Sequence, residues 1–216
     1  LWVRRLDEVT PQTLAGTTGA QFPFWSPDGR FIGFFASGKL NKIDISGGPP
    51  QPLCDAAAGA GGTWNRNGVV VFATSADGPL VKVSAGGGLP VAVTELDQPR
   101  GDIAHRHPKF LPDGQHFVFF VLSAKPESSG LYLGSLDSKE TRRLVSSDVM
   151  GAFAPPDHLF FMRASTLMAQ QFDPGRLELQ GDPFPVAEDV SANTANSVAG
   201  FALSDTGMLA FRPGGR

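Results

Sequence analysis

The chain has 216 residues and a mass of 22.8 kDa, enough for one large domain or two small ones. Its 26 glycines and 18 prolines exclude a large helical bundle, because both residues interrupt helices, while a hydrophobic fraction of 41% excludes a disordered chain. Eighteen basic and 21 acidic residues give a formal net charge of −3, which excludes the basic surface of a nucleic-acid-binding protein, and no apolar run reaches the ~18 residues of a membrane helix. We therefore predict a turn-rich, mostly β chain that inserts no segment into a membrane.

A short turn sequence repeats along the chain. Its copies are residues 24–31 and 110–117, which share Pro-Asp-Gly, and the weaker 64–69, 153–159 and 203–208. The turn glycines stand at positions 29, 68, 114 and 207, with His158 at the corresponding place of the fourth copy, so the copies are 39 to 49 residues apart. A period of about 40–50 residues is typical of β-propeller blades.

Each complete copy predicts four short antiparallel strands, which make one propeller blade. A strand precedes the turn at 21–25 and 107–111, and a strand rich in Phe and β-branched residues follows it at 31–35, 69–73, 117–122, 159–162 and 208–211. Third strands are expected at 40–45, 80–84, 131–136 and 167–172, and short fourth strands ending at Leu53, Val93 and Val145. These strands predict blades at 22–54, 63–94, 107–146 and 152–187.

The two ends of the chain predict half-blades. The chain begins with a third strand (1–6) and a fourth (12–14), and it finishes with a first (198–203) and a second (208–211). Joining 198–212 with 1–14 would give a fifth blade and close the ring without free sheet edges. We therefore predict one all-β domain over residues 1–216, a five-bladed β-propeller closed by its terminal strands. The alternative is a fragment of a six- to eight-bladed propeller.

The best polar cluster is the segment Asp102-Ile103-Ala104-His105-Arg106-His107, just before the third-blade turn. In an extended strand His105 and His107 point to the same side, about 6.6 Å apart, so they are weak candidates for a metal site with Asp102 as an oxygen ligand. Arg106 would face the other way. We prefer a hydrogen-bonding role for Asp102, His105, Arg106 and His107 at the rim or channel of the propeller, and we predict no metal.

Trp25 and Trp64 occupy equivalent places in neighbouring repeats. They are candidate ligand platforms, although packing between blades is the preferred interpretation because bulky aromatic residues more often fill cores. Residues 33–39 have the spacing of a phosphate-binding loop, but Leu40 stands where Ser or Thr should bind Mg²⁺. The common hydrolase, zinc-protease and kinase signatures are absent, so we predict no catalytic residues and no cofactor.

The segments WSPDGRFIGFF and GKLNKIDISGGPPQPL resemble the WD-like, PDG-motif propeller repeats of TolB-like proteins. Together with LWVRRLD and HPKFLPDGQHFVFF, they most resemble the C-terminal propeller of bacterial receptor-type serine/threonine kinases. The resemblance implies a non-catalytic, extracytoplasmic sensor or interaction domain that binds a protein, peptide or small molecule, with any kinase outside this chain. The alternatives are a TolB-like periplasmic scaffold and a propeller with hydrolase- or lyase-type activity at the His/Asp cluster.

Overall fold

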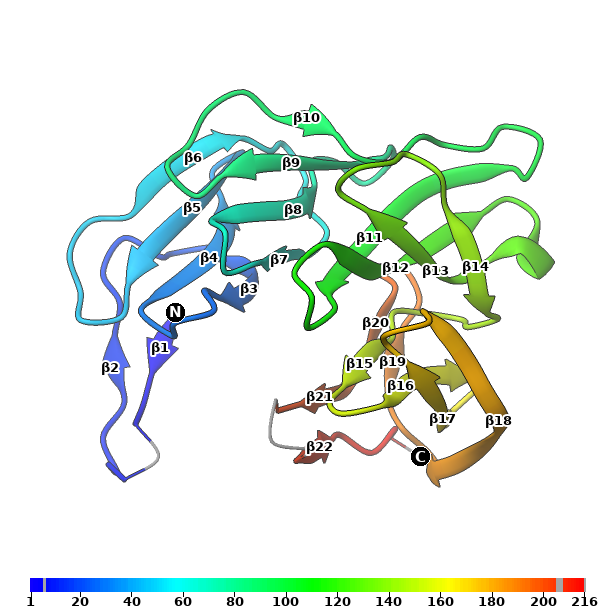
Figure 1. Ribbon diagram of the computed structural model, residues 1–216. Helices are drawn as coiled ribbons and strands as arrows, with labels where there is room; N and C mark the ends of the chain where they lie inside the picture. Colours follow the sequence, from blue (N-terminus) through cyan, green and yellow to red (C-terminus); the bar gives the residue numbers. More distant parts are fainter. Residues whose placement is uncertain (6, 205–207, 216) are drawn as a thin grey trace.

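Four antiparallel sheets of four strands each follow one another along the chain and stand around a common centre (Figure 1). The computed structural model describes residues 1–5, 7–204 and 208–215. Blade 1 contains β3 (Gln21–Trp25), β4 (Phe31–Ala36), β5 (Lys39–Asp44) and β6 (Gln51–Asp55), and blade 2 contains β7 (Gly62–Trp64), β8 (Val69–Ala73), β9 (Leu80–Ser84) and β10 (Val91–Ala92). Blade 3 contains β11 (Asp102–Phe110), β12 (His116–Ser123), β13 (Gly130–Ser135) and β14 (Arg142–Val145), and blade 4 contains β15 (Ala152–Ala154), β16 (His158–Arg163), β17 (Thr166–Asp173) and β18 (Glu178–Ala187). The fold is all-β, as predicted.

Helical structure is almost absent from the part of the chain that the structure describes. A single short 3₁₀ turn, η1 (Pro126–Ser128), lies between β12 and β13. None of the described residues belongs to a helix with the length and apolar character needed to span a bilayer.

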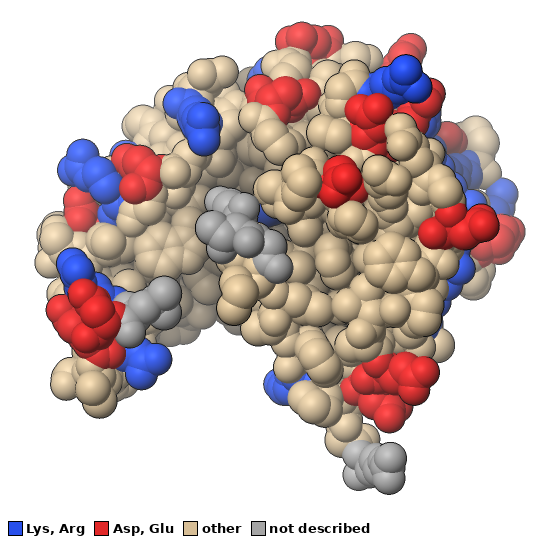
Figure 2. Space-filling view, turned by 60° about the horizontal axis from the view of Figure 1, so that its bottom comes forward, with Lys and Arg blue, Asp and Glu red and all other residues tan. Residues whose placement is uncertain are grey.

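The terminal strands form separate two-stranded sheets. These sheets are β1 (Trp2–Val3) with β2 (Gln12–Thr13), β19 (Ala192–Asn193) with β20 (Val198–Ala199), and β21 (Phe201–Leu203) with β22 (Leu209–Phe211). Figure 1 shows β1 and β2 across an opening from β21 and β22, and the space-filling view in Figure 2 shows this opening as a hollow. The described residues therefore make an open ring, consistent with part of a β-propeller.

The expected fifth blade, 198–212 joined with 1–14, is not formed as one sheet, because β22 and β1 do not pair. Among the described residues β1 pairs only with β2, and β22 pairs only with β21. Faces that another sheet would cover are left open, with Trp2 69%, Trp25 54% and Phe211 47% exposed. Leu6 of the first expected strand and the turn glycine Gly207 lie outside the described residues.

The hydrophobic core is divided into five clusters, and each lies between two successive sheets. Strand alternation produces this division, since neighbouring side chains of a strand point to opposite faces. In β12, Phe117 and Phe119 pack toward blade 2, whereas Val118 and Phe120 pack toward blade 4. The run of apolar residues in a middle strand thus stabilises two interfaces at once.

The turn after each inner strand is fixed by its own side chains. In blade 1, Ser26 Oγ donates to Asp28 Oδ1 at 2.6 Å and accepts from the Phe31 N–H at 2.8 Å. In blade 2, Asn65 takes the place of the serine, and its Nδ2 also donates to the carbonyl of Gly114 in the next turn at 2.7 Å. The repeated turns are therefore rigid and are joined from blade to blade.

The ring of Phe24 fills the space between blades 1 and 2, and glycines make room for it. A Cβ at Gly62 would lie 2.5 Å from this ring, and one at Gly33 would lie 2.4 Å from it. We expect Gly62→Ala to lower the free energy of unfolding by about 1–3 kcal/mol through overpacking, measured by urea denaturation. Gly86→Ala is the control, because its nearest neighbour would be at 3.5 Å. Equal stability of the two variants would contradict this account.

Candidate functional site

The predicted polar segment lies in β11, the innermost strand of blade 3, and this strand is irregular. Its pairing with β12 shifts register between Asp102 and Ala104 and again between Arg106 and Lys109. His107 has a left-handed φ of +50°. The two histidine rings have different partners, Thr94 for His105 and the carbonyl of Asn196 for His107.

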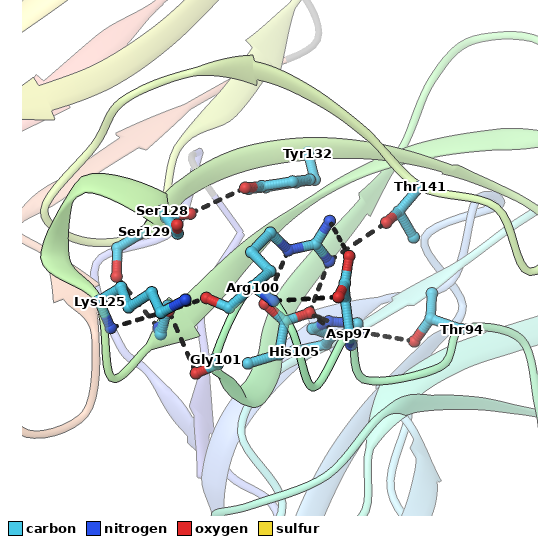
Figure 3. Close-up of polar contacts among 12 residues, drawn as sticks. Thr94, Asp97, Arg100, Gly101, His105, Lys125, Ser128, Ser129, Tyr132 and Thr141 are labelled. Carbon is cyan, nitrogen blue, oxygen red and sulfur yellow. Dashed lines mark hydrogen bonds and ion pairs between the residues drawn. The ribbon is translucent and has the colours of Figure 1, made fainter.

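Asp102 is the centre of a buried polar cluster, and its partners Asp97, Arg100 and His105 are labelled in Figure 3. Its side chain has no exposed surface, and it accepts two hydrogen bonds from Arg100, from Nε at 2.7 Å and from Nη2 at 2.5 Å. The Asp97 N–H donates to Asp102 Oδ2 at 3.0 Å, and His105 Nε2 lies 3.1 Å from the same oxygen. Every hydrogen-bonding position of this carboxylate faces protein.

The imidazole of His105 connects this cluster to blade 2. Its Nδ1 lies 2.8 Å from Thr94 Oγ1, which itself accepts the Leu80 N–H at 2.8 Å. Because the Thr94 oxygen accepts from the backbone, its proton is available for His105 Nδ1, and His105 Nε2 then donates to Asp102. A neutral His105 with its proton on Nε2 satisfies every contact.

The pKa shifts agree with this assignment. Burial raises the pKa of the Asp102 carboxyl, but hydrogen bonds from Arg100, the Asp97 N–H and His105 outweigh burial, so the net pKa lies below its usual range. Burial lowers the pKa of His105 despite the neighbouring carboxylate. The guanidinium of Arg100 also stacks on the Tyr132 ring, 4.6 Å from its centroid. The cluster is thus an ion pair beside a neutral imidazole, and its hydrogen bonds connect blade 2 to blade 3.

Arg106 and His107 make contacts across the centre of the ring. Arg106 Nη2 donates to the Ala76 carbonyl of blade 2 at 2.7 Å, and its Nη1 donates to Ser197 Oγ, between β19 and β20, at 3.2 Å. His107 Nε2 lies 2.7 Å from the carbonyl of Asn196 in the same loop. Burial lowers the pKa of His107 to about 4. These two residues tie blades 2 and 3 to the C-terminal strands.

The histidines do not assemble a metal site in this arrangement. Among the residues that the structure describes, no three His, Cys, Asp or Glu side chains lie close enough together to hold an ion. His105 and His107 direct their rings to Thr94 and Asn196 respectively, and Asp102 is bound to Arg100.

Trp64 lines an open groove between blades 1 and 2. The groove has a volume of about 510 Å³, and its walls include Pro27, Asp28, Phe31, Trp64, Asn65 and Arg66. The rings of Phe31 and Trp64 lie with centroids 6.1 Å apart and planes inclined by 31°. Aromatic walls beside a few polar groups are typical of ligand sites. This groove is the candidate functional site of the described chain.

The structure separates the two tryptophans that occupy equivalent repeat positions. Trp25 is exposed and does not line the groove, whereas Trp64 is half-buried against Phe31. Phe31 and Arg66, which also line the groove, were not among the predicted site residues. Phe31 could have been predicted from the repeat. It directly follows the turn of blade 1, and Trp64 directly precedes the corresponding turn of blade 2.

Comparison with known proteins identifies the fold. No family model and no curated protein sequence matches the chain. Similar solved structures include regucalcin from Agrobacterium tumefaciens, described as a calcium-binding protein, with a TM-score of 0.67 and 13% identity over 90% of this chain and 67% of that one. A gluconolactonase from Xanthomonas campestris gives 0.66 and 16% over 89% and 69%, and TolB from Acinetobacter baumannii gives 0.66 and 16% over 88% and 49%.

These likenesses correct one expectation. We expected a chain of this type not to be an enzyme, yet the similar structures include gluconolactonases and a luciferin-regenerating enzyme, at 12–16% identity. The fold therefore gives no ground for excluding catalysis. The chain spans about two thirds of regucalcin and of the Xanthomonas gluconolactonase, and about half of TolB. At these identities the similarity concerns the fold alone: the chain has a β-propeller fold similar to that of TolB.

Proposed function

We propose that residues 1–216 act as one ligand-binding β-propeller domain and that the groove beside Trp64 is its binding site. The observation that carries the proposal is an aromatic-walled groove of about 510 Å³, within the range of small-ligand pockets. The clusters at Asp102 and Arg106 are less suited to bind a ligand, because their polar atoms are engaged with protein.

The groove is bordered by rigid turns, which supports a binding role. Ser26 and Asp28 hold the blade 1 turn, and Asn65 accepts from the N–H groups of Asn67 and Val69 in the blade 2 turn. A preformed site loses little conformational entropy when a ligand binds.

The test is an NMR titration of the purified chain with small aromatic probes, indole and N-acetyl-tyrosinamide. We expect shift changes clustered at Phe31 and Trp64, and loss of binding in Trp64→Ala. Trp25→Ala is the matched control, since Trp25 occupies the equivalent repeat position outside the groove. Shift changes confined to another surface, or none at all, would overturn the proposal.

A finer proposal concerns the setting of the domain. The motif resemblance supports an extracytoplasmic sensor of a transmembrane serine/threonine kinase, and the TolB-like fold supports a periplasmic scaffold. Sequencing the gene upstream of Leu1 separates them. A kinase domain and a membrane span there would support the receptor, whereas a signal peptide alone would support the scaffold.

Hydrolysis is the second candidate function, since gluconolactonases are among the similar structures. The Asp102 and His105 cluster does not provide its acid and base, because both side chains are fully buried. An assay for opening of an aldonolactone by the purified chain tests this candidate. Activity that survives His105→Asn would locate the chemistry outside the cluster.

A further inference from the structure

We infer that the Trp64 groove selects an aromatic carboxylate, a ligand in which a flat ring lies next to a carboxyl group. The inference rests on the proposed function, because it specifies the ligand of that same groove. It follows from three observations: which donors of the groove are free, which acceptors are already used, and where the charges lie.

Two donors in the groove have no protein partner. Among the described residues, neither the Trp64 indole N–H nor the Arg66 guanidinium makes a hydrogen bond or ion pair. Trp64 is only half-buried, and the described residues include no fully enclosed side-chain nitrogen or oxygen without a partner. The indole N–H is therefore accessible to a ligand, as is the exposed Arg66 side chain.

Two side-chain acceptors of the groove, Asp28 Oδ1 and Asn65 Oδ1, are already occupied by protein donors. Asp28 Oδ1 accepts from Ser26 Oγ at 2.6 Å and from the Arg30 N–H at 3.1 Å. Asn65 Oδ1 accepts the N–H groups of Asn67 and Val69 at 3.0 and 2.9 Å. Free donors beside occupied acceptors favour a ligand that brings acceptors of its own.

The charges around the groove favour an anion. Lys42 Nζ and Arg30 Cζ lie 5.2 and 5.6 Å from the centroid of the Phe31 ring. Together with Arg66 they make three cations around the aromatic wall. Two carboxylates are nearby, those of Asp28 and Asp44, and Asp44 Oδ2 lies 3.8 Å from Arg30 Nη2. The charged groups that line the groove are Arg66 and Asp28, and around Phe31 the three cations outnumber the two carboxylates, although the whole chain carries a net charge of −3.

These features give each part of the ligand a place. The ring of the ligand packs against the aromatic wall that Trp64 and Phe31 form. The carboxylate of the ligand accepts hydrogen bonds from Arg66 and from the indole N–H of Trp64. A guanidinium matches the two oxygens of a carboxylate with two parallel donors. The same chemistry occurs in a free aromatic acid and in the C-terminal aromatic residue of a peptide.

The experiment compares matched acids and amides by isothermal titration calorimetry. The probes are phenylacetate and phenylacetamide for the free acid, and a tetraglycyl-phenylalanine peptide with a free or an amidated C-terminus. We expect each acid to bind about 10- to 100-fold more tightly than its amide, the range of a charge-assisted hydrogen bond. Tighter binding of the peptide acid than of phenylacetate would identify a peptide C-terminus as the source, and equal binding would identify the free acid.

Arg66→Gln is expected to remove the preference for the acid while leaving amide binding unchanged. Arg4→Gln is the matched control, because Arg4 is also exposed and makes no side-chain hydrogen bond or ion pair with the described residues. Equal binding of acid and amide to the native chain would overturn the inference and leave the groove as a neutral aromatic site. Failure of all four probes, together with failure of indole, would overturn the proposed function as well.

Discussion

Asp102→Ala is expected to lower the free energy of unfolding by about 3–5 kcal/mol, the usual cost of removing one partner from a buried ion pair. The substitution removes the carboxylate that accepts two hydrogen bonds from Arg100, which keeps the Asp97 carboxylate at 3.5 Å, and it removes the acceptor for His105. The fully buried His105 and two donors of the mostly buried Arg100 then lose their acceptor. Urea denaturation followed by circular dichroism measures the change.

The chain contains a matched control for this variant. Arg5 and Asp7 form the same pair with the same spacing and the same two hydrogen bonds, but their side chains are 73% and 68% exposed. Exposed ion pairs contribute little because water and salt screen them. We expect no measurable loss of stability in Asp7→Ala. Equal effects of the two substitutions would contradict the role of burial at Asp102.

Acidification is expected to destabilise the fold between pH 6.5 and about pH 4. Burial lowers the pKa of His107 to about 4 from the ordinary value of 6.5, so the unfolded chain binds a proton in this range that the folded chain does not. The stability that His107 contributes is complete above pH 6.5 and decreases as the pH falls. The slope reaches about 1.4 kcal/mol per pH unit, for a loss of about 3 kcal/mol across the window. The lowered pKa of His105 acts in the same direction.

His107→Asn tests the origin of this pH dependence. Asn tolerates the left-handed φ of +50° better than most residues, and its amide can donate to the Asn196 carbonyl without titrating. We expect a shallower decline of the free energy of unfolding below pH 6.5 in the variant. Above pH 7 the difference between the two proteins should be constant, which serves as the control. An unchanged slope in the variant would assign the acid sensitivity to other groups.

The blades were predictable because their signals are local. Pro-Asp-Gly turns followed by runs such as 117–122 specify a hairpin from a few adjacent residues, and β12 lies where that pattern indicates. Closure of the ring was not predictable in this way. It depends on the angle between blades, which the packing of whole interfaces determines, and Trp2 and Trp25 therefore remain exposed where a fifth blade was expected.

The site was predictable only in part. Trp64 was a candidate from its repeat position and lines the groove, but Arg66 carried no motif. The partner of His107 could not be predicted either, because the carbonyl of Asn196 is 89 residues away along the chain. The partner of His105 in the preceding blade, Thr94, is eleven residues away and could be identified only from the fold.

The contacts of Arg106 have a mechanical consequence. Its guanidinium joins the Ala76 carbonyl to Ser197, so it fastens the β8–β9 connection to the last strands across the middle of the ring. A force that pulls the two ends of the chain apart would load these hydrogen bonds before it separated the strands of blade 3. In single-molecule stretching, the first force peak would therefore report the rupture of the Arg106 hydrogen bonds.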